Sequence, residues 1–256
     1  MVFYFTATGN SLYVAKKLDV NPISIPQVMH TDKRSFEDDI IGIVFPDYAA
    51  TFPKIVERFL EESTFKTNYF YMIITYGHDH SDSPEFCAKI AKKNGVSVDY
   101  IGTVKMVDNY LPVFDMTEEM AIDKNLDEQI KEQLQAITEQ KREIPKATRT
   151  ERMKHKSVTA MNKVAPGFNN GSQIDVTDAC SGCGICEKVC PVSNFYLEDG
   201  LAKRRQSTCE FCLACAHNCP QKAIKLKLAD KNPNARYRNE HISLQEIMDA
   251  NNQTDR

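Results

Sequence analysis

Eight of the nine cysteines lie between residues 180 and 219, where one spacing pattern occurs twice. In each copy, two residues separate each of the first three cysteines from the next, and a fourth follows after three more in a Cys-Pro step. The first copy consists of Cys180, Cys183, Cys186 and Cys190, and the second of Cys209, Cys212, Cys215 and Cys219. This repeat constrains the chain more than any other stretch, because closely spaced thiolates can bind neighbouring atoms of one metal cluster.

The repeated spacing is that of bacterial ferredoxins, and it predicts two [4Fe–4S] clusters. Three cysteines of each copy can bind three irons of one cubane, whereas the turn at the proline carries the fourth cysteine to the other cluster. The expected ligands of the first cluster are therefore Cys180, Cys183, Cys186 and Cys219. Those of the second cluster are Cys209, Cys212, Cys215 and Cys190.

Disulfides and zinc are the alternatives for this repeat, and both fit poorly. Adjacent C-x-x-C steps would form strained rings, and nothing else in the sequence indicates secretion. Zinc prefers two well-separated C-x-x-C pairs around one tetrahedral ion. The ninth cysteine, Cys87, shares a helix face with Phe86, Ile90 and Ala91, so we expect it to be a small core residue.

The first half of the chain alternates strand and helix patterns, which favours an α/β fold with a doubly wound parallel sheet. Strands are expected near residues 2–5, 23–25, 40–45, 69–75 and 98–104, and helices near 10–18, 53–62, 83–94 and 117–143. The last helix is predicted as one element, with a capping-box-like start at Asp115 and Glu118 and a stop at Ile144-Pro145. Its expected apolar face consists of Ile122, Leu126, Ile130, Leu134 and Ile137.

A loop rich in hydroxyls, Thr6-Ala7-Thr8-Gly9-Asn10-Ser11, lies between the first strand and the first helix. Hydroxyls and free amides at a helix N-terminus suit a small phosphate, and this loop follows the strand beside the switch point of a doubly wound sheet. The sequence contains no P-loop lysine motif. An ordinary N-cap rich in Thr and Ser is the alternative.

The same loop resembles the T-x-T-G-N-[S/T] phosphate loop of flavodoxins. Two further stretches match that family, Pro46–Pro53 after the third strand and Thr75-Tyr76-Gly77 at the end of the fourth. Together with the cysteine repeat, the chain is similar to flavodoxin-fused ferredoxins, and the likeness extends through Met106–Pro112 and into the tail at Arg236-Tyr237. The resemblance implies bound FMN, with contacts from Thr6, Thr8, Gly9, Asn10, Ser11, Pro46, Tyr48, Ala49, Ala50, Thr51, Thr75, Tyr76, Gly77, Asn109 and Tyr110.

One departure from that family concerns Ala49 and Ala50, which stand where relatives tend to carry glycines. A Cβ makes a positive φ costlier by roughly 1 kcal/mol, and flavodoxins flip a peptide of this loop when the flavin is reduced. Two interpretations remain open: FMN binds with a less favoured one-electron form, or the flavin site is degenerate.

The expected domains are a flavodoxin-like FMN domain at residues 1–143, a basic connector at 144–173, a two-cluster α+β ferredoxin-like domain at 174–228 and a tail at 229–256. Met153, Val158, Met161 and Val164 could form one amphipathic helix that packs between the domains, and a disordered linker is the alternative. Within the cluster domain, Phe195–Ala202 is expected to be a hairpin with an Asp-Gly turn, and Ala223–Leu226 a strand that closes a small sheet with Ile174–Val176. Ser243 and Glu246 predict a capping box for a tail helix.

Charge and hydropathy limit the expected partners and location. The net charge is −3, and the basic excess of the C-terminal half is interpreted as neutralising the clusters rather than binding nucleic acid. The apolar runs, such as Ile40–Phe45, are too short to span a bilayer, and no signal peptide is apparent. We therefore expect a cytoplasmic protein without membrane contact, suited to anaerobic conditions because exposed cubanes react with oxygen.

The predicted function is electron transfer between the clusters, FMN and redox partner proteins. An enzyme is less expected, because the sequence offers no nucleophile and no acid–base pair, and His78 and His80 are interpreted as solvated loop residues. Two alternatives remain: a flavin-dependent reductase of a small organic substrate fed by the clusters, and an iron–sulfur sensor whose first domain lacks FMN. The oligomeric state, monomer or homodimer, stays open.

Overall fold

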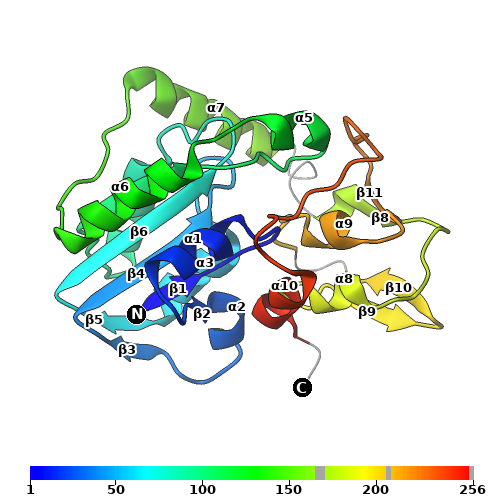
Figure 1. The fold of residues 1–256 in the computed structure, drawn as a ribbon, viewed down its shortest axis with the longest axis horizontal. Coiled ribbons are helices and arrows are strands. Elements are labelled where there is room, and N and C mark those ends of the chain that lie inside the picture. The colour runs from blue at the N-terminus through cyan, green and yellow to red at the C-terminus, as the bar shows by residue number, and fades with distance from the viewer. Residues whose placement is uncertain (165–170, 206–208, 254–256) are drawn as a thin grey trace. The chain divides into compact units, whose positions relative to one another are not determined.

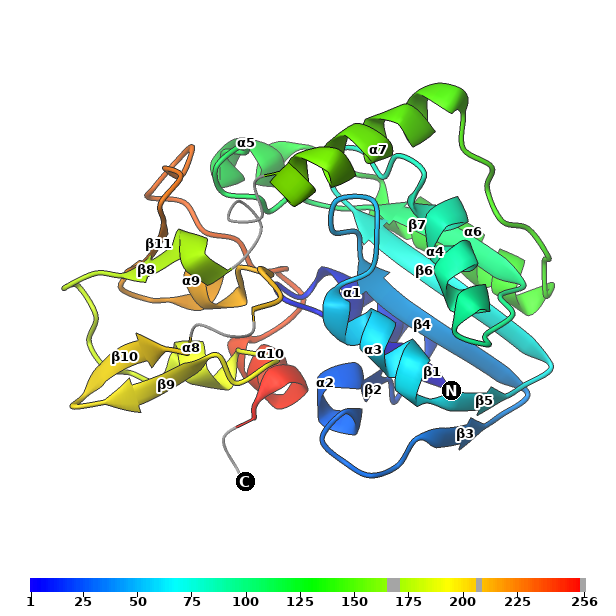
Figure 2. The same cartoon turned by 180° about the vertical axis from the view of Figure 1, so that it is seen from behind.

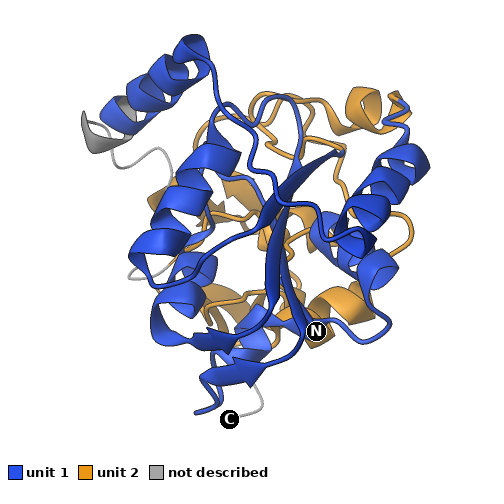
Figure 3. Ribbon diagram, turned by 90° about the vertical axis from the view of Figure 1, so that its left-hand side faces the viewer, with its two compact units in different colours: residues 1–5, 10–106, 123–160 blue, residues 6–9, 107–122, 161–256 orange. Residues whose placement is uncertain are grey.

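The computed structural model describes residues 1–164, 171–205 and 209–253. These residues form two compact units that interleave along the sequence (Figure 3). Unit 1 consists of residues 1–5, 10–106 and 123–160, and unit 2 consists of residues 6–9, 107–122 and 161–256.

Unit 1 is built on a parallel five-stranded sheet of the order β2-β1-β4-β6-β7 (Figure 1). Its strands are β2 (Ile23–Ser24), β1 (Val2–Tyr4), β4 (Ile40–Pro46), β6 (Tyr69–Tyr76) and β7 (Tyr100–Lys105). Every neighbouring pair in this sheet is parallel, and all five strands lie where the sequence predicts them. The mixed α/β fold with a parallel central sheet is thereby confirmed.

Helices pack on both faces of this sheet. On one face α1 (Asn10–Leu18) contacts α6 (Leu126–Thr138), and on the other α3 (Lys54–Glu62) contacts α4 (Ser83–Lys93), as Figures 1 and 2 show from opposite sides. The central strands β4 and β6 are therefore buried on both faces, which explains their continuous apolar runs. Cys87 on α4 is fully buried, so its predicted role as a core residue is confirmed.

A short second sheet and one short helix were not predicted. The strands β3 (Ser35–Glu37) and β5 (Thr64–Lys66) pair in parallel, and α2 (Ile25–Val28) follows β2. The rings of Phe36 and Phe65 stack at 5.8 Å across the small sheet, where Phe3 and Phe59 also pack. Elements of three or four residues carry too little periodicity to be recognised in a sequence.

The prediction of one helix over 117–143 is wrong. The chain forms α5 (Met116–Ala121) in unit 2 and α6 in unit 1, with a break in which Asn125 has a φ of 51° and donates its N–H to Asp123 Oδ1 at 2.8 Å. The predicted apolar face is also shifted, because Ile122 is 51% exposed and Leu134 is 38% exposed. Gln133 is buried instead and accepts the Tyr100 hydroxyl at 2.8 Å, in space that Gly102 of β7 leaves free.

The connector contains a helix, α7 (Arg149–Val164). Its described residues are held by polar contacts rather than by the predicted apolar side chains. Met153 is 68% exposed. Arg152 instead forms a bidentate pair with Glu85 of α4 at 3.0 and 2.7 Å, and the buried His155 contacts Asp82 at 2.5 Å. These polar partners lie about 70 residues away and leave no trace in the local pattern, and the side chains of Met161 and Val164 lie outside the described part of the chain. The predicted linker residues 165–170 lie outside the described residues.

Unit 2 consists of two antiparallel ribbons with short helices. The strand β8 (Ile174–Val176) pairs with β11 (Ile224–Leu226), and β9 (Phe195–Glu198) pairs with β10 (Leu201–Arg204), as predicted. Asp199 and Gly200 form the hairpin turn with φ values of 51° and 73°. Besides α5, the described part of this unit contains the helices α8 (Ile185–Lys188), α9 (Ala214–Asn218) and α10 (Leu244–Asn251) and a 3₁₀ turn at Gly171–Gln173. The capping box at Ser243 and Glu246 is confirmed.

The compact units divide the chain differently from the predicted domain ranges. Hydrogen bonds tie residues 6–9 and 107–122 to the C-terminal part: Asn239 N–H donates to Thr8 O at 2.8 Å, Lys231 N–H donates to Leu111 O at 2.8 Å, and Asn232 donates to Asp115. Among the described residues, no helix is both long enough and apolar enough to cross a membrane.

Candidate iron–sulfur centre

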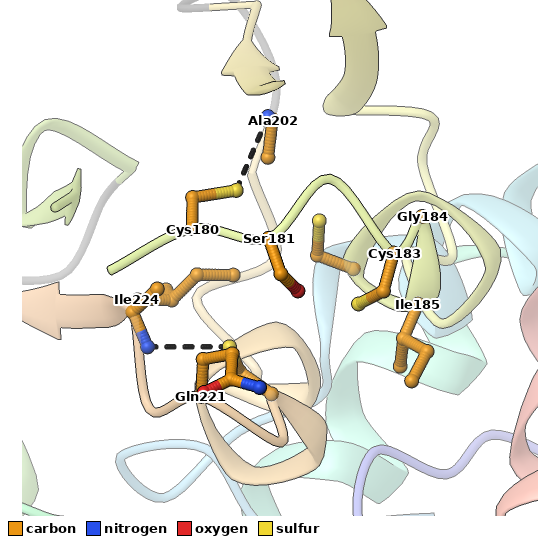
Figure 4. Close-up of a pocket in the computed structure, with 11 residues that line it drawn as sticks. Cys180, Ser181, Cys183, Gly184, Ile185, Ala202, Gln221 and Ile224 are labelled. Carbon is orange, nitrogen blue, oxygen red and sulfur yellow. Dashed lines mark hydrogen bonds between the residues drawn. The ribbon is translucent and has the colours of Figure 1, made fainter. Parts of the chain in front are cut away.

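Four thiols of unit 2 line one small cavity, which Figure 4 shows in close-up. Three of them, Cys180, Cys183 and Cys186, come from the first copy of the pattern, and the fourth, Cys219, comes from the second copy. The cavity is also lined by other residues of the first cysteine loop, by Ala202 of β10, and by Ala223 and Ile224 at the start of β11. Cys183 is exposed and Cys186 is buried, so this set lies near the surface of the unit.

The remaining four thiols gather around Cys190. Burial raises the pKa of Cys212 and Cys215, and the nearby Cys190 thiol raises each of them further. Burial likewise raises the pKa of Cys209, and Cys190 again adds to the shift. Such electrostatic effects require closeness, so Cys190 of the first copy lies near Cys209, Cys212 and Cys215 of the second, and Cys215 also lies near Cys186.

Backbone N–H groups point at thiols in both sets. Ala202 N–H donates to Cys180 Sγ at 3.4 Å, a bond drawn in Figure 4, and Ala223 N–H donates to Cys219 Sγ at 3.2 Å. In the other set, Asn194 N–H donates to Cys190 Sγ at 3.1 Å and Phe211 N–H donates to Cys209 Sγ at 3.3 Å. Hydrogen bonds of this kind stabilise thiolate sulfur and tune the reduction potential of a bound cluster.

The two cysteine loops share a backbone shape although their sequences differ. Gly182 and Gly184 have φ values of 68° and 75°, and the equivalent residues of the second copy, Phe211 and Leu213, have values of 51° and 60°. Gly182 has no alternative, because a Cβ there would lie 1.9 Å from the Gly200 carbonyl oxygen. The second loop keeps the left-handed conformation with ordinary side chains, which costs about 1 kcal/mol per residue.

Thiols must lose their protons before they can bind metal. Burial, together with the neighbouring Cys180, Cys183 and Cys219, raises the pKa of Cys186 to about 12. Cys186 is therefore protonated in the metal-free protein near neutral pH, and cluster binding must release its proton.

The predicted anion loop, Thr6–Ser11, is almost fully buried, and its hydroxyls have protein partners. Thr6 Oγ1 accepts the Gly9 N–H at 3.1 Å, and Thr8 Oγ1 accepts Asn109 Nδ2 at 2.7 Å. Ser11 Oγ shares a hydrogen bond with Thr75 Oγ1 at 2.8 Å. The structure thus brings Thr8 together with Asn109, and Ser11 together with Thr75, four residues that the sequence assigned to one site.

The other predicted flavin contacts lie in loops that follow β4, β6 and β7. Ala49 and Ala50 both have a positive φ, 58° and 65°, held by a Tyr48 N–H to Thr51 O bond of 3.0 Å and by Asp47, which accepts the Ala50 N–H at 3.2 Å. The loop therefore adopts a backbone conformation for which glycine is suited, although the sequence has alanine at both positions.

Three aromatic residues among those predicted contacts have aromatic neighbours. Tyr48 lies edge-on to Phe5 at 6.3 Å and Tyr76 edge-on to His80 at 4.7 Å. In unit 2, the Tyr110 ring lies 6.4 Å from Phe211 of the second cysteine loop. Pro46 ends β4, and Gly77 follows β6 directly.

His217 was not predicted from the sequence. This residue of α9 is only 5% exposed, and both ring nitrogens are engaged: Nε2 with Asn109 O at 2.8 Å, and Nδ1 with the Tyr237 N–H at 3.1 Å. Burial lowers the pKa of His217 to about 4, so the ring is neutral. The one available signal was a histidine placed between two cysteines of the repeat.

Comparison with known proteins agrees with this geometry. Residues 179–224 match the family model of the 4Fe-4S dicluster domain, which supports iron–sulfur cluster binding and defines the class of the protein. No solved structure matches the chain.

Two curated relatives match a similar length of chain. A ferredoxin of Methanothermococcus thermolithotrophicus is 34% identical over 53 residues, which cover 20% of this chain and 88% of that protein. One component of the ion-translocating oxidoreductase complex of Methanosarcina acetivorans is 46% identical over 48 residues, which cover 19% of this chain but only 18% of that protein. Through this part, the chain belongs to the ferredoxin family.

Proposed function

We propose that this protein transfers single electrons through two [4Fe–4S] clusters to or from redox partner proteins. The observation that carries the proposal is the cavity that Cys180, Cys183 and Cys186 share with Cys219 of the other copy, and the nearness of Cys190 to the three remaining thiols supports it. This exchange of the fourth cysteine is the arrangement that two-cluster ferredoxins use. The first cluster would be bound by Cys180, Cys183, Cys186 and Cys219, and the second by Cys209, Cys212, Cys215 and Cys190.

The residues around the thiols fit bound clusters. The first set of cysteines lines a cavity rather than a packed core, and four backbone N–H groups already point at sulfur in the two sets. A [4Fe–4S] cluster supplies one-electron chemistry at low potential. The chain's own contribution is the burial of Cys190 and Cys215 in the second set, the exposure of Cys183 in the first, and these fixed hydrogen-bond donors.

We further propose that residues 1–143 form a flavodoxin-like FMN domain built on the sheet of unit 1. Numbered along the chain, its sheet has the order 2-1-3-4-5, which is the order of flavodoxin-like folds, and such sheets bind ligands beyond the carboxyl ends of their strands. The hydroxyls of Thr6 and Thr8 accept hydrogen bonds but keep their own protons, so both can still donate to a phosphate. FMN, when bound, supplies one- and two-electron chemistry.

An iron–sulfur sensor with a flavin-free first domain is the second candidate. The burial of Thr6, Thr8 and Ser11 and their existing protein partners favour it, because a phosphate must compete with those bonds. The two candidates share the clusters and differ in the flavin.

One experiment separates these candidates. The chain is purified under anaerobic conditions, and iron, acid-labile sulfide and extracted flavin are measured on the same sample. We expect about eight irons and about eight sulfides per chain, together with FMN in stoichiometric amount. Full iron without flavin would favour the sensor, and a chain that takes up neither iron nor sulfide would overturn the electron-transfer proposal itself.

A further inference from the structure

His217 lies at the point where the two thiol sets meet. It belongs to α9, which carries Cys215 of the second set and ends beside Cys219 of the first. The helix has only five residues, and helices this short are unstable by themselves. Its conformation therefore depends on what holds the cysteines at its two ends.

The His217 ring forms hydrogen bonds with two different segments of unit 2. Nε2 faces the Asn109 carbonyl at 2.8 Å and therefore carries the ring proton, while Nδ1 accepts the Tyr237 N–H at 3.1 Å. One neutral tautomer satisfies both bonds. The ring thus fixes the loop of residues 107–112 and the tail of residues 236–239 at once.

Both paths end on Thr8. On the first path, Asn109 Nδ2 donates to Thr8 Oγ1 at 2.7 Å. On the second, Asn239, two residues beyond Tyr237, donates its N–H to Thr8 O at 2.8 Å. Asn239 and Ile242 also pack so tightly against Gly9 that a Cβ there would lie 3.0 Å from each. Two of the hydrogen bonds that hold the loop of residues 6–9 therefore come from segments bonded to His217, and a third runs from Asn251 Nδ2 to Thr6 O at 2.9 Å.

We propose that cluster binding orders the loop of residues 6–9 through His217. In the metal-free chain, no metal joins the thiols of Cys215 and Cys219 at the two ends of α9. Cluster binding fixes both cysteines, and with them the helix and the imidazole ring. Asn109 and Asn239 then hold Thr8 in place, so the loop reaches its final shape only in a chain that carries its clusters. The inference rests on cluster binding and is independent of what the loop binds.

Hydrogen exchange measured by mass spectrometry tests this order of events. The full chain is compared before and after anaerobic reconstitution with iron and sulfide, and exchange is followed in peptides covering residues 6–13, 107–113 and 236–242. We expect reconstitution to slow exchange in all three peptides by about tenfold, since each holds a buried hydrogen bond that cluster binding would secure. Full iron uptake with unchanged exchange in these peptides would overturn the coupling while leaving the proposed function intact. A chain that takes up no iron would overturn both.

Two variants of His217 distinguish the hydrogen-bond path through Asn109 from the path through Tyr237 and Asn239. His217→Gln retains a donor near the Nε2 position, and His217→Asn retains an acceptor near the Nδ1 position. In the reconstituted protein, we expect His217→Asn to speed exchange mainly in residues 107–113, and His217→Gln mainly in residues 236–242. His241→Gln is the matched control, because the His241 side chain is 54% exposed, and it should exchange as the wild type does.

Asn109→Ala keeps the test decisive if the His217 variants fail to bind clusters. It removes the donor to Thr8 Oγ1 without changing α9, so iron content should stay at the wild-type value while residues 6–13 exchange about tenfold faster. If residues 6–13 of this variant, reconstituted with full iron, exchange as slowly as in the wild type, the path through Asn109 is excluded.

Discussion

Several residues other than glycine adopt the left-handed backbone conformation at the places where function is proposed. Ala49 and Ala50 do so after β4, and Phe211 and Leu213 do so in the second cysteine loop. Each such residue costs about 1 kcal/mol relative to glycine, and strain of this kind persists only where surrounding contacts maintain it. The conformations are held by hydrogen bonds such as Phe211 N–H to Cys209 Sγ.

Replacing Ala49 or Ala50 with glycine should therefore stabilise unit 1. We expect each variant to raise the free energy of unfolding by up to about 1 kcal/mol, because glycine carries no penalty at these φ values. Urea denaturation followed by circular dichroism measures the change. Ala88→Gly in the middle of α4 is the control and should destabilise by about 1 kcal/mol, since alanine is the better helix former. Loss of stability in the Ala50→Gly variant would contradict this account of the loop.

A second prediction at the residue scale concerns the fourth ligand of each cluster, which the proposal assigns to the other copy of the cysteine pattern. Cys190→Ser should damage the cluster of Cys209, Cys212 and Cys215, although Cys190 follows the first copy in sequence. We expect iron content to fall by up to about half, and electron paramagnetic resonance of the reduced protein to lose the signal of that cluster. Cys87→Ser is the control, because Cys87 lies in unit 1 and should leave iron content unchanged. Damage confined to the cluster of Cys180, Cys183 and Cys186 would refute the assignment.

At the scale of elements, α7 shows how a helix can be held by charge. Arg152 pairs with Glu85, Lys154 pairs with Asp79 at 3.0 Å, and Ser81 Oγ donates to Glu151 O at 2.9 Å. The hydrogen bond from Arg152 is the main reason that the pKa of Glu85 lies below its ordinary value of 4.5. The ionised carboxylate therefore helps to hold α7.

This pairing predicts a pH dependence with a definite sign. A lowered pKa in the folded protein stabilises it above the unfolded pKa, and the contribution is lost as pH falls through the lowered value. Protection against hydrogen exchange in residues 149–160, taken relative to the intrinsic rate at each pH, should therefore fall a few-fold below about pH 4.5, and Glu85→Gln should show the same loss of protection at neutral pH. Glu61→Gln, an exposed residue of α3, is the matched control. If Glu85→Gln exchanges as the wild type does, the ion pair does not hold α7.

At the scale of the whole molecule, the chain joins a ferredoxin unit and a parallel α/β unit on one polypeptide. Linking two redox modules raises their effective concentration to about millimolar when the linker permits contact. If the flavin proposal holds, we expect reduced clusters to reduce FMN within one molecule. Anaerobic stopped-flow should then give a rate that does not depend on protein concentration, and sizing distinguishes a monomer from a stable dimer. A rate proportional to concentration would mean that the modules exchange electrons only by collision.

The sequence by itself determined the features that depend on neighbouring residues. The five main strands, the Asp199-Gly200 turn, the capping box at Ser243 and the two cysteine copies were all predicted, because periodicity, turn chemistry and ligand spacing act over a few residues. Short elements such as β3 and the break between α5 and α6 were not, since their local signals are weak or point to a longer helix.

Only the tertiary structure decided which distant segments share hydrogen bonds. The bond from Asn251 Nδ2 to Thr6 O spans 245 residues, and that from His217 to Asn109 O spans 108. Such pairs leave no periodic trace, because either partner is an unremarkable polar residue in its own segment. The grouping of residues 6–9 and 107–122 with the ferredoxin part, the polar attachment of α7 and the position of His217 therefore emerged only from the folded chain.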